Sequence, residues 1–490
     1  MADAPQAAAG AAEMPAEVTS LLDELTVATG TKDQDAARIA RRGIQELLTN
    51  LVNSPSQKID KALIDAYIAE IDAKLSEQLD EILHSEPVQK LESSWRGLKF
   101  LVDQTDFREN IRIDILNVSK DALLEDFENS PEIPKSGLYQ HVYTAEFGQA
   151  GGQPFGAMIA NYDFGPGPRD IALMQKVSAV GAMSHCPFIA AAGPQMFGVD
   201  DFQQLPKLKD LSSVFEQPQY TKWNSFRESE DSRYFALTMP RFLLRHPYDP
   251  AANPVKAFDY QEKVTDGHGK YLWGNAAFAF ATRLTASFAD SRWMMNCTGP
   301  QSGGMVENLV LHQYKSLEGI ETKIPTEALI SDRREYELAE CGFIGMTMYK
   351  NTDKACFFSA NSVQKPKSFP DTAEGRASST NYKLGTRMPY MMMVSRLAHY
   401  LKVIQRDNLQ TWQTPVKMQT ELTEWLRQYA VDMDSPQPEV ANRRPIRKFA
   451  VEVSEVEGEV GFYKVGLKVM PHIKFEGANF ELSLVGKLDK

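Results

Sequence analysis

The clearest hydrophobic pattern in the chain lies between residues 56 and 85. Six aliphatic residues recur there at steps of three or four, with Asp, Glu and Lys between them: Ile64, Ile68, Ile71, Leu75, Leu79 and Ile82. This spacing predicts a long amphipathic helix with a narrow apolar seam, suited to lengthwise packing on another helix. Its partner is either a second helix expected over residues 87–102 of the same chain or a helix of another chain, and the pattern leaves both open.

A different pattern, strict alternation of apolar and polar residues, marks residues 446–490. It predicts strands around three groups of residues: Val451 and Val453; Tyr463, Val465 and Leu467; and Phe480, Leu482 and Leu484. The strands follow a proline-rich linker over residues 434–445. A three-stranded tail leaves strand edges that solitary proteins normally block. Strand addition from another chain would satisfy them, and so would folding back onto the body.

Between these ends, residues 106–433 alternate short β-like runs with helical runs, which is typical of a mixed α/β body. A loop is predicted over residues 364–380 because Lys, Pro, Ser and Thr are frequent there. Ser331 or Asp332 is expected to cap a helix that contains residues 335–339. Strands are predicted over residues 111–118, 155–164, 187–192 and 342–349, and further helices over residues 170–183, 271–288, 389–406 and 416–431.

Charge is concentrated at the N-terminus of this 490-residue chain, whose net charge is −12. Residues 1–85 hold seven basic and fifteen acidic residues, a net of −8, so the remainder carries only −4. We expect residues 1–55 to form a mobile acidic arm with helices over residues 18–27 and 33–51, followed by the long helices of residues 56–105. The acidic balance argues against a nucleic-acid partner. The absence of a long apolar run or a secretion signal argues against a membrane partner and for the cytoplasm.

The sequence offers no convincing catalytic, cofactor or metal site. The glycine-rich run of residues 148–156 lacks the ending of a phosphate loop and precedes a strand, so we interpret it as a tight turn. Four widely spaced cysteines form no CxxC pair and are expected to be buried thiols. Residues 227–233 mix acidic side chains with arginines: Arg227, Glu228, Glu230, Asp231 and Arg233. We interpret this pattern as a structural ion-pair network, although paired carboxylates can also serve as general acid and base. Residues 332–335 have the same character.

Several long blocks, in order along the chain, resemble the large contractile-sheath subunit of the bacterial type VI secretion system (the TssC/VipB family). The resemblance covers nearly the whole chain from about residue 85 onward. Its blocks include SSWRGLKFLV (93–102), PFIAAAGPQMFG (187–198), WNSFRESEDSRYFALTMPRFLLRHPY (223–248), KYLWGNAAFAFATR (270–283), TEALISDRREYELAECGFI (326–344) and SRLAHYLKVIQRD (395–407).

The resemblance implies a structural and mechanical protein without cofactors. In that family the large subunit pairs with a small sheath subunit and stacks with copies of itself in six-membered rings around an inner tube protein. Baseplate components and, indirectly, a recycling unfoldase ATPase are further partners. The resemblance places partner contacts on the predicted helix around Ile68 and on the predicted C-terminal strands, which would share a sheet with neighbouring subunits. The alternatives are a cytoplasmic α/β enzyme that uses the carboxylates of residues 227–233, and an adaptor that does not polymerise.

Overall fold

A computed structural model describes residues 42–43, 61–251, 258–265, 267–316, 319–408, 414–433, 436–455, 463–472 and 482–487. Apart from residues 42–43, the helices predicted over residues 18–27 and 33–51 lie outside this set, as do the turns predicted between the C-terminal strands. The chain divides into two compact units. One contains Met1–Leu79 with Asp249–Gln261, and the other contains Asp80–Tyr248 with Glu262–Lys490.

The second unit is built on a six-stranded mixed sheet, which confirms the mixed α/β body. The first four strands in the sheet order are mutually parallel, and the last two join by antiparallel pairing. In spatial order the strands are β1 (Met158–Phe164), β2 (Phe188–Ala192), β3 (Phe235–Met239), β9 (Phe343–Met348), β10 (Ala355–Phe357) and β6 (Met305–Val306).

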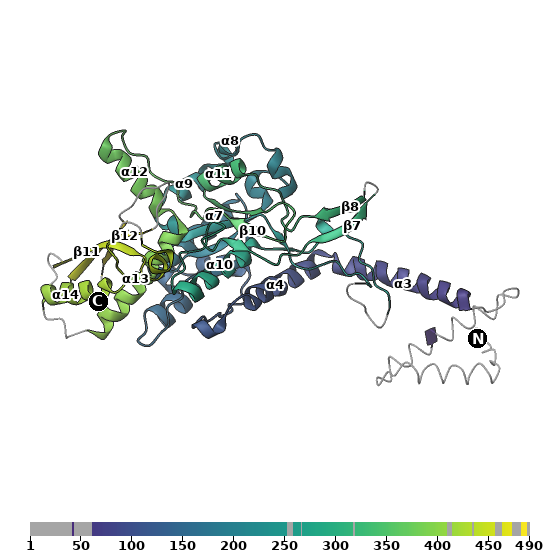
Figure 1. Cartoon of the computed structure of the whole chain (residues 1–490), viewed down its shortest axis with the longest axis horizontal. Helices are drawn as coiled ribbons and strands as arrows, with labels where there is room; N and C mark the ends of the chain where they lie inside the picture. The colour runs from purple at the N-terminus through teal and green to yellow at the C-terminus, as the bar shows by residue number, and fades with distance from the viewer. Residues whose placement is uncertain are drawn as a thin grey trace, which may run out of the picture. The chain divides into compact units, whose positions relative to one another are not determined.

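Helices cover both faces of this sheet. Successive residues of each strand point to opposite faces, and both faces are apolar, so each face needs a covering layer. Phe188, Phe235 and Phe343 face the larger core. That core is closed by α5 (Lys120–Asn129), α7 (Pro168–Ser184), α8 (Leu211–Phe215), α9 (Thr221–Glu228) and α11 (Asp332–Glu340). Their neighbours Ile189, Ala236 and Ile344 face a second core closed by α10 (Ala276–Ser291) and α13 (Met388–Asp407). Figure 1 shows α7 and α10 beside the sheet.

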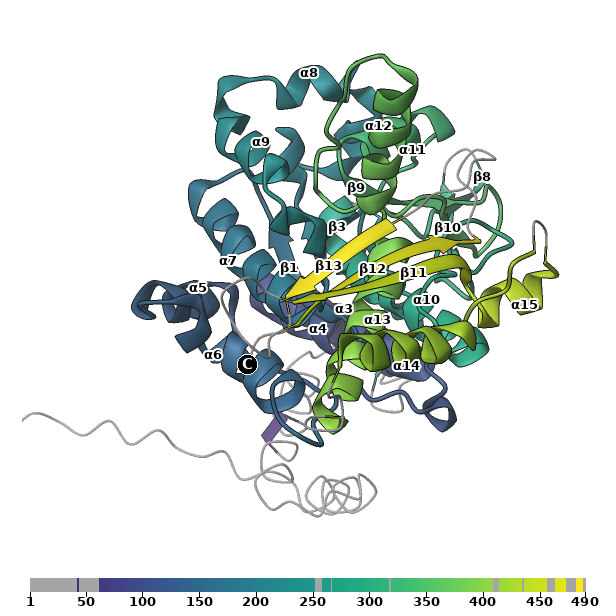
Figure 2. The ribbon, with the colours of Figure 1, turned by 90° about the vertical axis from the view of Figure 1, so that its left-hand side faces the viewer.

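A smaller antiparallel sheet forms the C-terminal layer, and Figure 2 shows it across α13 and α14 (Pro415–Arg427). The order β11–β12–β13 makes β11 (Ile446–Glu455) and β13 (Leu482–Lys487) the two edges and β12 (Tyr463–Pro471) the centre. In register, Val451 lies opposite Leu467, and Leu467 lies opposite Leu484. The three strands predicted from alternation are therefore confirmed.

The remaining elements are connections and short pairs. Two long helices precede the sheet, α3 (Lys61–Leu83) and α4 (Glu86–Asp103). Two ribbons lie outside the main sheet: β4 (Phe242–Leu243) with β5 (Trp273–Gly274), and β7 (His312–Ser316) with β8 (Gly319–Lys323). The other short elements are α6 (Gly137–Tyr139), α12 (Ala373–Gly385), α15 (Pro438–Arg443), a π-helix (Gln140–Phe147), and 3-10 turns at Phe107–Glu109, Ile133–Lys135, Pro194–Phe197, Phe202–Lys207, Pro218–Tyr220, Asp231–Tyr234 and His268–Lys270.

Four predictions about elements need correction. Residues 111–118 form no strand, because alternation alone supplies no neighbouring ladder. The loop predicted over residues 364–380 contains the start of α12, where the Thr372 hydroxyl accepts a hydrogen bond from the Gly375 amide. The linker contains α15, with Pro438 in the first turn, where its missing N–H costs nothing. Helix α10 begins at Ala276 rather than at residue 271, because the preceding residues include β5.

Candidate assembly surfaces and polar clusters

The apolar seam of α3 is open to solvent over much of its length. Ile68, Ile71 and Leu75 are 50%, 43% and 42% exposed, and Ile82 is 57% exposed. The side chain of Ile64 lies outside the described residues. The opposite face carries charged residues such as Glu70, which pairs with Lys74 at 2.8 Å. Half-exposed aliphatic side chains repeated at helical spacing form a surface suited to a partner helix.

The C-terminal strands present a different picture, because one face of their sheet is already buried. Val451, Val465 and Leu467 are buried in a core with residues of α13 and α14, and Val453 packs against that core. These side chains pack against other parts of the same chain. This face of the sheet therefore folds back onto the body, which is one of the two arrangements that the sequence left open. The side chains of Tyr463, Phe480, Leu482 and Leu484 lie outside the described residues.

The two edges of this sheet differ in how far the chain itself covers them. At the β11 edge, the Ile446 amide donates to the Tyr429 carbonyl and the Ile446 carbonyl accepts from the Val431 amide. Farther along, the Gln419 side-chain amide donates to the Val451 carbonyl at 2.8 Å. Beyond β13, the described residues contain no further strand. The backbone of β13 is therefore the edge suited to strand addition.

The glycine-rich run is a fixed turn. It follows the π-helix, and Gly151 has a positive φ of 81°. A Cβ atom on Gly152 would lie 2.1 Å from the Glu146 carbonyl oxygen, so only glycine fits there. The Arg406 guanidinium of α13 donates to the carbonyls of Phe147 and Gln149. These contacts agree with the interpretation of residues 148–156 as a tight turn into β1.

The acidic and basic run of residues 227–233 forms no carboxylate pair. Arg227 is buried and donates to the backbone carbonyls of Val363 and Glu340, at 2.9 and 3.1 Å. Glu228, Glu230 and Asp231 are exposed. The structural interpretation therefore holds for Arg227, but its partners are carbonyls rather than the neighbouring carboxylates. At residues 332–335, Ser331 is the helix cap, and Arg333 and Arg334 both pair with Glu337.

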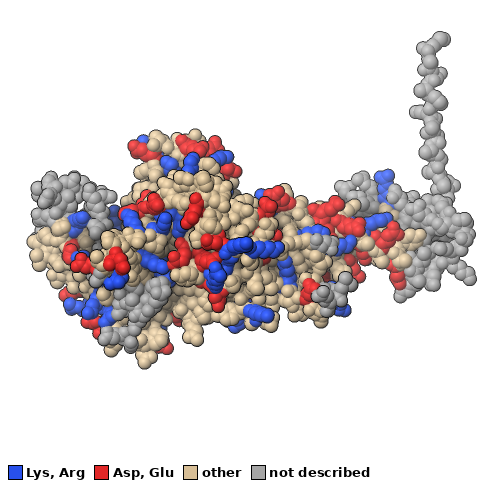
Figure 3. All heavy atoms as spheres, turned by 90° about the horizontal axis from the view of Figure 1, so that it is seen from above, with Lys and Arg blue, Asp and Glu red and all other residues tan. Residues whose placement is uncertain are grey.

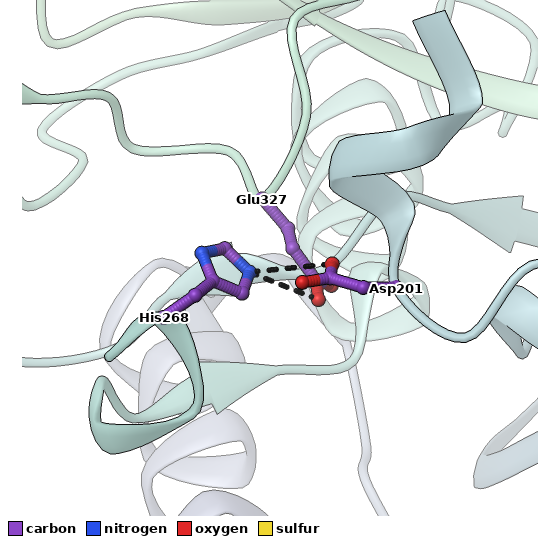
Figure 4. A group of neighbouring side chains, drawn as sticks. All are labelled: Asp201, His268 and Glu327. Atoms are coloured by element: carbon purple, nitrogen blue, oxygen red, sulfur yellow. Dashed lines mark hydrogen bonds and ion pairs between the residues drawn. The ribbon is translucent and has the colours of Figure 1, made fainter. Parts of the chain in front are cut away.

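A polar cluster that sequence reasoning missed joins Asp201, His268 and Glu327 (Figure 4). The His268 Nε2 atom lies 3.2 Å from Glu327 and 3.6 Å from Asp201. Glu327 also accepts two hydrogen bonds from the Arg241 guanidinium, at 2.7 and 2.8 Å. No short motif could reveal this cluster, because its residues are about sixty positions apart.

The hydrogen bonds at the other ring nitrogen decide what this cluster can do. His268 Nδ1 lies 3.0 Å from the Lys323 ammonium and 2.7 Å from the Gln203 amide nitrogen, and both groups are donors. Nδ1 is therefore an acceptor, and Nε2 carries the hydrogen toward Glu327. A metal at Nε2 would move that hydrogen to Nδ1, where it would face the Lys323 ammonium. The charge of Glu327 is also balanced by Arg241. We therefore interpret the cluster as a structural ion-pair network rather than a metal site.

Other titratable groups of the described core are buried and inert. His399 Nε2 lies 2.9 Å from the Ser184 carbonyl, and His185 contacts the Tyr234 hydroxyl. Burial lowers the pKa of both histidines to about 4. All four cysteines are free and buried, which confirms that expectation, and burial raises the pKa of the Cys297 and Cys356 thiols to about 12. Such groups serve packing rather than nucleophilic chemistry.

Comparison with known proteins settles the family. The model for EvpB/VC_A0108, tail sheath N-terminal domain, matches residues 65–364, and that for the EvpB/VC_A0108, tail sheath gpW/gp25-like domain matches residues 377–488. This chain belongs to the EvpB/VC_A0108 tail sheath family. It is 38% identical over 484 residues to the type VI secretion system sheath protein TssC1 of Pseudomonas aeruginosa strain PAO1, covering 97% of this chain and 96% of that protein.

Membership of the tail sheath family confirms the resemblance drawn from the sequence blocks. Proteins of this family are structural sheath subunits and not enzymes, so the α/β enzyme alternative is set aside. Two solved structures, a sheath tail protein from Desulfitobacterium hafniense and the baseplate of the anti-feeding prophage, match with TM-scores of 0.29 and 0.30. They are 11% and 10% identical, and the matches cover 67% and 78% of this chain and 57% and 80% of those chains. These scores are too low to add to the assignment.

On the face of this sheath family member that Figure 3 draws, acidic and basic side chains are intermixed over the body. Among the described helices, none is both long enough and apolar enough to cross a bilayer. The seam of α3 and the edge of β13 are two surfaces of the described chain that are suited to protein partners.

Proposed function

We propose that this chain is the large subunit of a type VI secretion contractile sheath. It pairs in the cytoplasm with a small sheath subunit and polymerises with copies of itself, in six-membered rings, into a helical tube around an inner tube protein. Contraction of that tube propels the inner tube and its cargo outward. The observation that carries this proposal is the 38% identity to a type VI sheath protein over nearly the full length of both chains.

The α3 seam supports the proposed pairing with the small subunit. Its aliphatic side chains repeat over several turns and are about half exposed, which is the arrangement that helix-on-helix association buries. Replacing Ile68 and Leu75 with aspartate should leave the body folded and weaken co-purification of the small subunit at least tenfold. Ile320→Asp is the matched control, because Ile320 is also exposed but lies in β8. Equal capture by both variants would contradict the role of α3.

The β13 edge supports a shared sheet between neighbouring subunits. Deleting residues 482–490 would remove that edge while leaving Val451, Val465 and Leu467 in their core. We expect a soluble chain that still binds the small subunit but forms no filaments. A cut after Pro445 is a poorer test, because it would also uncover the apolar faces of α13 and α14.

Mechanically, the proposed sheath stores free energy in its extended packing and releases it by moving rigid bodies that stay joined through shared strands. Residues 434–445 would form the hinge between the body and the C-terminal sheet. Their prolines, together with α15, would limit slack in this connection. Baseplate components would anchor one end of the tube, and an unfoldase ATPase would recycle contracted sheaths.

Electron microscopy of the chain co-expressed with its small subunit tests the proposal directly. Long hollow filaments are the expected result. A discrete heterodimer at every protein and salt concentration would favour the adaptor that does not polymerise. A monomer that captures no small subunit would overturn the proposal as a whole.

A further inference from the structure

Residues 111–117 form an extended segment whose backbone is unpaired within the described chain. Their sequence, IRIDILN, alternates as a strand does, yet these residues make no backbone hydrogen bond to any other described residue. The adjoining Val118 carbonyl accepts a side-chain bond from the Tyr162 hydroxyl of β1, at 2.6 Å. A strand-like segment without a ladder presents a row of free donors and acceptors.

Helix α4 carries an exposed apolar stripe and shares a small core with this segment. Leu91, Trp95 and Val102 lie at positions i, i+4 and i+11 of the helix, on one face, and Leu91 and Trp95 are more than 60% exposed. Leu98, beside that stripe, packs in the same small core as Ile113 of the extended segment. The extended segment and α4 are therefore joined through this core. Ile115 and Leu116 extend the apolar surface, and both are exposed.

Charges around this surface are already paired within the chain. Arg112 pairs with Asp114 at 2.9 Å, and Lys99 pairs with Asp103 at 2.8 Å. The Arg292 guanidinium pairs with Glu109 and also donates to its carbonyl. A partner that fits here must therefore bring apolar side chains and backbone hydrogen bonds rather than a compensating charge.

We propose that residues 111–117 are a strand-addition site. Its occupant is an extended, uncharged, aliphatic-rich segment of a partner chain, whose side chains also cover the α4 stripe. The five exposed apolar side chains of this surface offer on the order of 500 Å², a large part of the roughly 800 Å² per partner of a standard interface. This inference rests on the proposed function in one respect: the partner is taken to be a second protein of the sheath.

Hydrogen exchange on the complex that co-purifies with the full chain tests the backbone part. Alternate amides of residues 111–117, those facing the added strand, should exchange at least a hundredfold more slowly than those of the exposed turn residues 350–351. Exchange as fast as in that turn would overturn the proposal, and so would failure to capture any partner. Filament formation is scored separately by electron microscopy, so a heterodimer with protected amides would support this inference while contradicting polymerisation.

Photo-crosslinking identifies the occupant. A benzophenone amino acid at position 115 should crosslink to an extended segment of a different protein, and the same group at position 320 should not. A crosslink only within the chain, or to a second copy of it, would overturn the assignment. As a matched pair of variants, Ile115→Arg should weaken partner capture at least tenfold, whereas Ile320→Arg should leave it unchanged. Unchanged capture by Ile115→Arg would also count against the proposal.

Discussion

Replacing Arg245 with methionine should destabilise the body strongly, because this guanidinium is the centre of a buried ion network. Arg245 donates to Glu92 of α4 at 2.8 Å and to both carboxylate oxygens of Glu262, at 2.5 and 3.0 Å. Arg245 and Glu262 are 8% and 6% exposed. Glu262 also accepts from the Tyr248 amide and contacts His84. One residue thus connects three segments that are far apart in sequence.

The expected magnitude follows from what the substitution leaves behind. Methionine can fill most of the volume but leaves Glu262 buried without its counter-charge, and breaking a buried pair in this way costs about 3–5 kcal/mol. Glu262 keeps its contacts with the Tyr248 amide and His84, so we expect a loss of unfolding free energy at the lower end of that range, about 3 kcal/mol. The matched control is Arg333→Met. Arg333 is 84% exposed in its pair with Glu337, so the loss should stay below about 1 kcal/mol.

The pH dependence distinguishes a lost charge from lost packing. Burial raises the pKa of Glu262, but the hydrogen bond and charge of Arg245 outweigh it and hold the pKa below its ordinary 4.5. Without Arg245, burial dominates and the pKa rises. Lowering the pH from 7 to 4.5 then protonates Glu262 in the folded variant and relieves the penalty, whereas the wild type keeps its ion pair over this range because its Glu262 pKa lies below 4.5. The gap in unfolding free energy should therefore narrow from pH 7 to pH 4.5.

Urea denaturation followed by tryptophan fluorescence measures this gap. A loss under about 1 kcal/mol at pH 7, or a gap independent of pH, would refute the ion-network reasoning and leave Arg245 as ordinary packing.

Three further perturbations test the interior. Gly152→Ala should cost about 1–3 kcal/mol in urea denaturation, because its Cβ would meet the Glu146 carbonyl; an unchanged midpoint would show that the turn can relax. Since burial lowers the pKa of His185 and His399 from 6.5 to about 4, these two side chains gain protons only in the unfolded chain between those pH values. Their contribution should therefore lower the unfolding free energy as the pH drops from 6.5 to 4. His399→Gln should flatten that slope, and an equal slope would contradict the assignment. Ser331→Ala should cost about 1 kcal/mol by removing the α11 cap, with loss of helical ellipticity as its check.

The long periodic segments could be predicted from the sequence because their signal is local. Helix α7 begins two residues before its predicted start and ends one residue after its predicted end, and β2 and β9 agree with their predictions to within one residue at each end. The central strand β3 was not predicted, although its five residues are as fully buried as those of β2. The strand predicted over residues 111–118 is wrong because the segment alternates well but has no neighbouring strand to pair with.

The polar clusters could not be predicted, because their members meet only through the fold. Arg245 lies 153 positions from Glu92, and no spacing rule connects them. His268 likewise lies 59 positions from Glu327 and contacts it only in the folded chain. By contrast, the α3 seam could be predicted from the sequence. Its aliphatic residues recur at helical spacing along one segment, and this pattern does not depend on whether a partner is present.

The polar side chains that are hydrogen-bonded within the chain, and the surfaces that are left without a partner, together indicate the kind of function. An enzyme places polar groups in a cleft where their bonding is completed by substrate, and their pKa values are matched to the reaction. In the described body, Arg245, His268 and Arg227 have their hydrogen bonds completed by other residues of the chain. Surfaces left open for a partner lie instead on the apolar seam of α3, on the edge of β13 and on the extended segment at residues 111–117. Such surfaces bind other proteins over large areas, which is the requirement for a subunit of a polymer.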